Sequence, residues 1–483
     1  MTTIRGGKRR RKKRGTTRRV RLRRVRIGAP DPRLTPAAGV EAVREADRVL
    51  GLTQALDQGI GPVKERARGL SGGQLLVSMA CAQLAGQDFL VGLDRRRADT
   101  AGQALEPVPT PAATTAAGIA KRFGPQQLVG IETGIGVINT EFVSRLPLVR
   151  RTSLLRVATI DGDATDVEVY GRTKEKAAHA YTGALTLRPH LGFWAEASVP
   201  LAAQLMGGTE DPRANCVELL DRAITALPVG VQQVRARWDA GYFAADLATA
   251  CVERGVEFAI GAKRTPTVMA AAAGLGRYHW VPAVDMADTE VAVIDYRPGP
   301  WPQEANIACI ARRTRIPVEK IPTARARKRR TVPKDQLVLA LEGRIDVVEG
   351  YSFILTNLDV SDDEKLAEVE YWYRHRTDIE ELNKNVKHGT ALRHLPSADH
   401  RVNSVWMWAG LLGCAIAAWI QEITGIDHGN GRGRMTVARF RRELIRIPAR
   451  LTRRAGAIVL RPPPGPNLLA TVLTALQKLP RPG

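Results

Sequence analysis

The sequence predicts an α/β fold in which a helical N-terminal region precedes a mixed α/β core, and a β-rich insertion interrupts that core. Three observations predict it. Apolar residues recur at helical spacing from about residue 38 to 105. Paired strands, followed by alternating helices and strands, begin near residue 150. Strand-like stretches separated by Pro and Gly then fill residues 270–358.

In the N-terminal region, residues 39–56 and 73–85 read as helices, and a Pro/Thr/Ala-rich linker follows at 107–120. Residues 31–120 are therefore predicted to form a helical DNA-binding region. Either one of its helices reads a DNA groove, or the helices only pack against one another. The sequence leaves both alternatives open.

The predicted core comprises residues 150–269 and 359–425. Residues 154–171 alternate like a strand pair with a turn at the Asp/Gly cluster, and 192–205 reads as another strand. The next four elements alternate: helix 216–227, strand 231–243, helix 244–255 and strand 256–263. Within the 270–358 insertion, four strands are expected, at 290–296, 305–313, 336–343 and 351–358. Residues 426–483 are expected to form a basic helical C-terminal region.

The charge of the chain calls for a polyanionic partner. The formal net charge is +23, and residues 5–26 contain fourteen Arg or Lys and no acid, so the remainder still carries 23 − 14 = +9. DNA, RNA and anionic membranes are the candidate partners. Residues 1–30 are expected to form a disordered basic arm. The arm could equally be a solubilising tail or the product of an upstream start codon, so it does not by itself indicate a function.

Cysteine use and hydropathy exclude several other classes. The five cysteines are scattered and form no C-x-x-C pair, so neither a zinc site nor a disulfide framework is expected. This fits a cytoplasmic, nucleoid-associated protein. The basic N-terminus is not followed by the apolar stretch of a signal peptide. The apolar run 405–420 is shorter than the roughly 20 residues of a membrane span, so a buried core helix and no membrane partner are expected.

Two aspartates lie where strands are expected to end. Asp161 and Asp163 share one face of a strand and Asp166 takes the other, although a hairpin turn at the same Asp-Gly is an alternative. Asp239 follows a buried strand and precedes Ala-Gly, which places it at the edge of an α/β sheet. A turn or a helix cap is the alternative for Asp239.

A third carboxylate lies on the helix predicted over 368–389. Tyr373, Arg376, Glu380 and Lys387 follow one another at offsets of 0, 3, 7 and 14, so they fall within about 60° of one another around the helix. Glu381 lies 100° away from Glu380. The alternative is a solvated face with ion pairs such as that of Arg376 with Glu380.

The spacing Y-x₂-R-x₃-E-x₆-K of these four residues resembles the signature of bacterial insertion-sequence DDE transposases of the cut-and-paste branch. IDGDAT resembles the first-carboxylate strand of that family, whose motif is D-x-T, and RWDAGYF resembles the second. The D-x-T match alone favours Asp163 over Asp161. The resemblance spans about residues 38–460 and implies a ribonuclease-H-like core with a β-rich insertion before the third carboxylate.

The resemblance also implies roles for individual residues. Asp163, Asp239 and Glu380 would be the catalytic ligands of Mg²⁺, with Mn²⁺ as a substitute. Arg376 and Lys387 would hold phosphates near the cut end, and Tyr373 would contact the same strand. Relatives flip a base against an aromatic side chain, for which Trp280 and Trp301 are candidates.

The expected function is therefore DNA transposition by phosphoryl transfer, with terminal inverted repeats and target DNA as partners and a homodimer when two ends are synapsed. A metal-dependent DNA endonuclease without strand transfer is one alternative. A catalytically inactive DNA-binding regulator is another. A basic RNA-binding protein is disfavoured, because the aromatic-basic motifs of the usual RNA-binding modules are missing.

Overall fold

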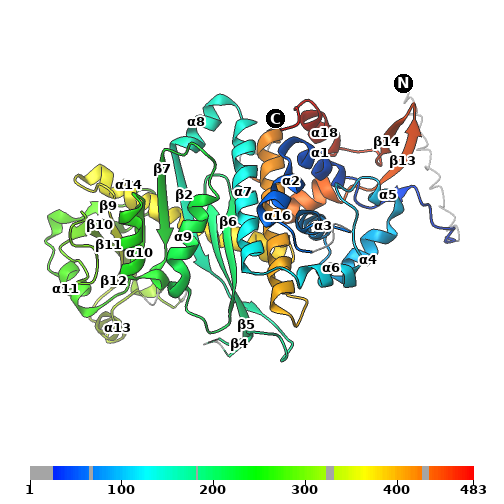
Figure 1. Cartoon of the computed structure of the whole chain (residues 1–483). Helices are drawn as coiled ribbons and strands as arrows, with labels where there is room; N and C mark the ends of the chain where they lie inside the picture. Colours follow the sequence, from blue (N-terminus) through cyan, green and yellow to red (C-terminus); the bar gives the residue numbers. More distant parts are fainter. Residues whose placement is uncertain (1–24, 65–68, 181–182, 323–330, 427–433, 483) are drawn as a thin grey trace, which may run out of the picture.

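The computed structural model describes residues 25–64, 69–180, 183–322, 331–426 and 434–482. A long sheet with helices on it occupies the left and middle of Figure 1, and a helical region stands at its right. The predicted arm 1–30 lies mostly outside the described residues. Residues 25–30 are exposed and form no regular element.

The sheet has the spatial order β6-β5-β2-β7-β8-β12-β11-β10-β9, with the short strands β3 and β4 also paired to β5. Strand β5 runs antiparallel to both of its neighbours, β2 and β6. Strands β7 and β8 run parallel to the central β2. The strand bounds are β2 Val157–Ala164, β3 Val167–Glu168, β4 Ala178–His179, β5 Leu185–Trp194, β6 Val199–Gly207, β7 Gln233–Trp238, β8 Glu257–Ala262, β9 Val281–Pro282, β10 Thr289–Ile294, β11 Ala308–Pro317 and β12 Val347–Thr356.

Strand β2 passes straight through the Asp/Gly cluster, so the expected turn at that cluster is wrong. Gly162 makes the straight path possible. A Cβ atom there would lie 1.8 Å from the Trp238 ring of the neighbouring strand. Glycine lets that indole cover β2 directly, and the acids on either side of it stay on the opposite face of the sheet.

The strands of the insertion extend the core sheet: β12 pairs antiparallel with β8, and β11, β10 and β9 follow it outward. The expected strand at 336–343 is wrong, because Lys334–Leu341 forms helix α13. Short apolar runs do not distinguish a strand from a buried helix, and Pro333 at the N-cap favours the helix. Residues 192–205 are likewise not one strand: they contain the end of β5, a turn and most of β6.

The core helices lie where the sequence predicts them. They are α9 Cys216–Thr225 and α10 Ala245–Glu253. A further helix, α11 Pro266–Ala273, was not predicted. The helix predicted over 368–389 is broken into α14 Asp363–Arg374, a 3₁₀ turn His375–Thr377, α15 Asp378–Lys384 and a π-helical turn Asn385–Gly389. These changes of pitch alter the angular relation between Tyr373 and the later residues of the signature.

The N-terminal helices are α1 Val40–Leu50, α2 Leu52–Ile60, α3 Gly72–Leu84, α4 Val91–Ala98, α5 Thr100–Gln103, α6 Ala113–Ala120, α7 Pro125–Ser144 and α8 Leu148–Arg156. The expected linker 107–120 is therefore helical over its second half. These helices share one apolar core with the sheet, to which Leu76, Trp238 and Trp406 all belong.

Helix α16, His400–Thr424, joins the helical region to the sheet because it packs on both α3 and β6. It is the one described helix that is long and apolar enough to cross a membrane. Its apolar stretch is entirely buried inside the protein, however. The prediction that residues 405–420 form a buried core helix is confirmed. All five cysteines are buried and free.

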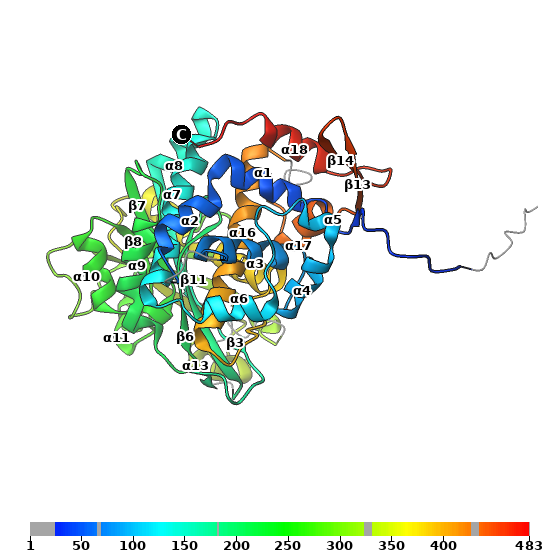
Figure 2. The same cartoon turned by 45° about the vertical axis from the view of Figure 1, so that its right-hand side comes forward.

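The C-terminal region is only partly helical, which corrects the expectation for 426–483. It contains α17 Val437–Phe440, a π-helical turn Arg441–Ile445, the hairpin strands β13 Ala449–Arg454 and β14 Ala457–Arg461, and α18 Leu469–Gln477. Strand β13 also pairs with β1, Leu34–Thr35, from the other end of the chain. Figure 2 shows the hairpin and the N-terminal segment on the same side of the molecule.

Candidate active site

Asp163 and Asp239 lie at the carboxyl ends of the neighbouring parallel strands β2 and β7. The last aligned pair of these strands is Gly162 with Trp238, and the two aspartates follow it. Adjacent strands are about 4.8 Å apart, and residues in register on parallel strands share a face. The two carboxylates therefore stand side by side at one edge of the sheet.

The turn after β7 fixes the second aspartate. The carboxylate of Asp239 accepts a hydrogen bond from the Gly241 amide at 2.7 Å and caps a 3₁₀ turn, Ala240–Tyr242. On β8, Gly261 lets this turn approach closely, because a Cβ atom there would lie 2.7 Å from both the Ala240 nitrogen and the Tyr373 hydroxyl. The cap uses one oxygen, Oδ1, of the Asp239 carboxylate.

Asp161 has a different environment from Asp163 although both lie on the same face of β2. It is fully buried, and both of its oxygens accept hydrogen bonds from Arg237, at 2.6 and 2.8 Å. Arg237 is aligned with it on β7 and is itself buried. A carboxylate already engaged by a bidentate guanidinium is a poor metal ligand. The surroundings thus favour Asp163 over Asp161 independently of any motif.

The segment from α14 through α15 runs along this face of β2 in the same direction as the strand. Trp372 Nε1 donates to Thr159 Oγ1 at 3.4 Å, near the start of the strand. Asn383 Nδ2 donates to Asp163 Oδ2 at 2.7 Å, further along. The Lys387 ammonium donates to Thr165 Oγ1 at 2.6 Å, just beyond its end. Residues further along the helix segment therefore contact residues further along the strand, all on the strand face that the helix covers.

Arg376 is buried between this segment and the strand ends, with 5% of its surface exposed. Its charge interacts with those of Asp163, Asp239 and Asp161. A guanidinium placed beside two neighbouring carboxylates reduces their mutual repulsion. Arg376 therefore offsets part of the negative charge at this edge.

Tyr373 and Lys387 also hold the strand ends. The Tyr373 hydroxyl donates to the Trp238 carbonyl at 3.1 Å, directly before Asp239. The Lys387 ammonium donates to the Asp166 carbonyl at 2.8 Å in addition to Thr165. Both side chains, for which contacts to DNA are predicted, position the backbone on which the two aspartates stand.

Glu380 lies on the helix face that carries Arg376 and Asn383, four residues after the first and three before the second. Its side chain is exposed. Over the described ranges, no three acidic, His or Cys side chains form a ready-made metal cluster. The structure thus brings Asp163 and Asp239 together and places Glu380 on the facing side of α15, without assembling all three. Glu381 points elsewhere and lines a separate cleft of about 470 Å³.

Burial and the neighbouring charge dominate the electrostatics of Asp163. The pKa of Asp163 is raised to about 6, chiefly by loss of hydration and in smaller part by the adjacent Asp239. Arg376 and the hydrogen bond from Asn383 act in the opposite direction. Burial likewise lowers the pKa of the Lys387 ammonium. A cation bound at this edge would relieve the repulsion between the aspartates.

Asn383 is a site residue that the sequence analysis missed. Its spacing was the available signal, since it follows Arg376 by seven residues and Glu380 by three and so continues the stripe. While its amide nitrogen holds Asp163, its Oδ1 atom is buried and has no hydrogen-bond partner among the described residues. An amide oxygen is a ligand that hard divalent cations accept.

The two tryptophans considered for base flipping are both buried. Trp280 is 7% and Trp301 is 3% exposed. The ring of Trp301 packs against Phe243 and Phe258, and the Arg313 guanidinium covers Trp280 at 4.1 Å. In this conformation neither ring is accessible to a flipped base.

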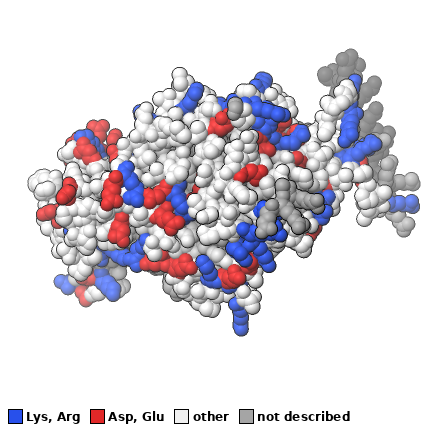
Figure 3. All heavy atoms as spheres, viewed as in Figure 1, with Lys and Arg blue, Asp and Glu red and all other residues white. Residues whose placement is uncertain are grey.

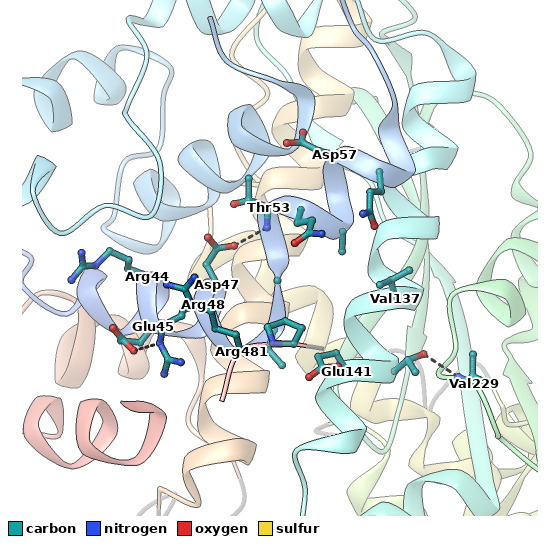
Figure 4. A pocket seen from close by; sticks show the side chains of 17 residues that line it. Arg44, Glu45, Asp47, Arg48, Thr53, Asp57, Val137, Glu141, Val229 and Arg481 are labelled. Carbon is teal, nitrogen blue, oxygen red and sulfur yellow. Dashed lines mark hydrogen bonds and ion pairs between the residues drawn. The ribbon is translucent and has the colours of Figure 1, made fainter. Parts of the chain in front are cut away.

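A cleft of about 1170 Å³ lies away from the acidic edge, between α1, α2, α7 and the C-terminal Arg481 and Pro482 (Figure 4). Some of its charged side chains have partners within the cleft. The Arg48 Nε atom is 2.7 Å from Glu45, and Asp47 accepts from the Thr53 amide at 2.7 Å. None of the candidate catalytic residues lines it.

Comparisons with known proteins identify the family of this chain. The family model described as "Transposase DDE domain group 1" matches residues 17–321 and 327–481. Among solved structures, a distant match is the cryo-EM structure of the piggyBac transposase synaptic complex with hairpin DNA, at 9% identity and a TM-score of 0.41. It covers 92% of this chain and 82% of that chain. No curated protein matches. Because the family model spans nearly the whole chain, this protein belongs to the DDE-domain transposases of group 1.

Proposed function

We propose that Asp163, Asp239 and Glu380 hold the divalent cations with which this DDE transposase cuts and joins DNA, and that the physiological ion is Mg²⁺. The observation that carries the assignment is the pair of aspartates in register on β2 and β7, faced by the helix segment that bears Glu380. Manganese, which accepts the same oxygen ligands, is expected to substitute.

The donor set fits such an ion. Three carboxylates and the unpartnered amide oxygen of Asn383 are hard oxygen ligands, the kind that Mg²⁺ prefers. When bound, divalent cations at this edge would activate the attacking oxygen and stabilise the leaving oxygen of the phosphodiester. The protein's own part is to fix the carboxylates. Asn383 orients Asp163, the Gly241 amide orients Asp239, and the breaks on either side of α15 leave Glu380 on a short helix that can adjust.

We also propose that the core is ribonuclease-H-like. The antiparallel strands β6, β5 and β2, followed by β7 and β8 parallel to β2, support this, with the first two carboxylates at the ends of β2 and β7. On this view the strands β9–β12 are the insertion before the third carboxylate. The DNA substrates would be the terminal inverted repeats of an insertion sequence and a target duplex. Two copies of the chain would act together at paired ends, in the cytoplasm at the nucleoid.

The test is cleavage and joining of a terminal-repeat duplex into a supercoiled plasmid with Mg²⁺. D163N, D239N and E380Q should each lose both steps and keep DNA binding, since each removes a ligand and little else. E381Q and D378N, which change acids on the other side of α15, are the matched controls and should remain active. Undiminished cleavage by any of the first three would remove that residue from the site. Cleavage without joining by the wild type would make the protein an endonuclease.

A further inference from the structure

The hairpin β13–β14 has one strongly basic face. Its strands are joined by Ala455 and Gly456 alone, both at positive φ (49° and 78°), as a tight two-residue hairpin turn requires. The register aligns Arg450 with Arg461 across the strands, and Arg454 lies four residues beyond Arg450. With the alternation of a strand, these three arginines share one face.

The other face attaches the hairpin to the protein. Leu451 and Leu460 are aligned across the strands and pack, partly buried, against the main apolar core. Toward the turn, Arg453 and Ile458 on this same face are exposed, so the ribbon is amphipathic only at the end that joins the protein. Arg450 keeps 52% of its side-chain surface exposed, and Arg454 and Arg461 are exposed as well.

Little negative charge balances this face. From Leu444 to the last residue the sequence contains seven Arg or Lys and no acid. Arg450 lies 3.3 Å from Asp31, whereas no ion pair of Arg454 or Arg461 is found within the described part of the chain. Two like charges aligned directly across a hairpin destabilise it. A polyanion laid along the face would offset that repulsion.

The position of the hairpin suits a contact remote from the cut. It stands at the end of the molecule opposite the β9–β12 strands in Figure 1, and Lys or Arg side chains, blue in Figure 3, lie at that end. The segment with fourteen cations, residues 5–26, leads into β1, which is paired to β13. That segment lies almost wholly outside the described residues, and the hairpin face is defined without it.

We propose that Arg450, Arg454 and Arg461 on the outward face of hairpin β13–β14 bind the phosphates of duplex DNA away from the cleavage site. The inference rests on the DNA-transposase function and adds a second contact surface to it. A two-stranded ribbon is narrow enough to follow a major groove, and a guanidinium can bind a phosphate with two hydrogen bonds. Contacts of this kind position the duplex and read no base.

The test measures duplex binding by the full-length chain as a function of salt, between about 50 and 200 mM, by fluorescence anisotropy. The variant R450Q/R454Q/R461Q is compared with wild type on a terminal-repeat duplex and on an unrelated duplex of equal length. Removing three phosphate contacts should lower the slope of log K against log salt by about two to three. Affinity at the higher salt should fall about tenfold or more, for both duplexes.

Two further variants control for charge and for folding. R450K/R454K/R461K keeps the charge and should retain most of the affinity and the full slope. K121Q/R122Q/R277Q removes the same charge from exposed positions elsewhere and should change both much less. A thermal unfolding transition shows whether the glutamine hairpin variant is folded. If it is folded and binds as the K121Q/R122Q/R277Q control does, the hairpin is not a DNA-binding surface.

Cleavage separates this proposal from that for the active site. At low salt, with duplex saturated, the glutamine hairpin variant should cut at the wild-type rate because its carboxylates are intact. D163N should show the reverse, normal binding without cutting. A hairpin variant that binds normally but cannot cut would contradict the assignment of the hairpin to DNA binding and leave the metal-site proposal untouched.

Discussion

Asp161 and Asp163, two residues apart on one face of β2, have opposite energetic consequences at the residue scale. Asp161 forms a buried bidentate pair with Arg237, so each group satisfies the other. Asp163 faces the like charge of Asp239 and depends on Arg376 and Asn383 for compensation. The first aspartate stabilises the fold, and the second is held in an environment that a bound cation would improve.

Thermal unfolding at pH 8 without metal should separate these roles. D161N leaves the Arg237 guanidinium buried without its counter-charge and should destabilise the protein by about 3 kcal/mol. D163N removes one of two neighbouring like charges and should leave the melting temperature unchanged or raise it. An equal loss of stability in both variants would contradict the distinction.

Asn383 is expected to act by positioning Asp163. N383A should raise the Mg²⁺ concentration needed for half-maximal cleavage by about 10- to 100-fold, as loss of a supporting hydrogen bond does at metal sites, and should leave DNA binding intact. N385A is the matched control, because Asn385 faces the Val437 amide rather than the strand. A lower maximal rate with an unchanged Mg²⁺ requirement would mean that Asn383 does not act through the metal.

The sequence could predict the candidate residues but not their partners. Periodicity places Asp163, Asp239 and Glu380 at strand ends and on a helix face, and the family resemblance then selects them as candidates. The sequence could not show that Arg237 forms an ion pair with Asp161, because these residues lie 76 positions apart and meet only through the register of β2 with β7. The sequence likewise predicts that Tyr373 and Lys387 contact DNA. It does not predict their hydrogen bonds with Trp238 and Thr165, which depend on the same packing.

At the element scale, two elements differ most from the prediction: the sheet, and the helix predicted over residues 368–389. Three of the four strands expected in the insertion are strands, yet the pairing of β12 with β8 cannot be predicted from the sequence, because any exposed sheet edge could accept it. The breaks in helix 368–389 were hidden too, since no Pro or Gly lies between residues 368 and 388 to mark them. Contacts with β2 accompany the change of pitch.

Helix α7 is attached to the back of the sheet through Glu132. Its Oε1 atom accepts from the Ala203 amide of β6 and from Arg222 of α9, both at 3.0 Å, and the side chain is 3% exposed. Burial raises the pKa of Glu132 from 4.5 to about 7, and Arg222 only partly opposes this. A raised folded-state pKa means that the stabilising contribution is complete below pH 4.5 and is lost as pH rises to about 7.

The variant E132Q should reveal this pH dependence. Glutamine keeps the acceptor oxygen and removes the charge, so the variant should gain stability relative to wild type as pH rises from about 5 to 8. The gain is bounded at about 3 kcal/mol by the size of the shift. Unfolding in denaturant at several pH values measures it. E218Q, an exposed acid beside the same Arg222, should show little change. A difference between E132Q and wild type that does not vary with pH would refute the account.

At the scale of the whole molecule, one apolar core joins helices and sheet, and α16 runs through it. The sequence predicted the burial of α16 from its length and its apolar content, but not that the N-terminal helices would share its core. Because α16 contacts both α3 and β6, the helical region and the catalytic sheet are expected to form one rigid body. DNA held by the helical side would then be held in register with the carboxylates.

The central claim is that three carboxylates from distant parts of the chain share one divalent-cation site. The most direct measurement is Mn²⁺ binding by the full-length protein with bound end duplex, followed by electron paramagnetic resonance. D163N, D239N and E380Q should each bind Mn²⁺ at least about tenfold more weakly than wild type, because each loses a ligand. E381Q should bind as wild type does. Wild-type affinity in E380Q, or a loss in E381Q instead, would contradict the site.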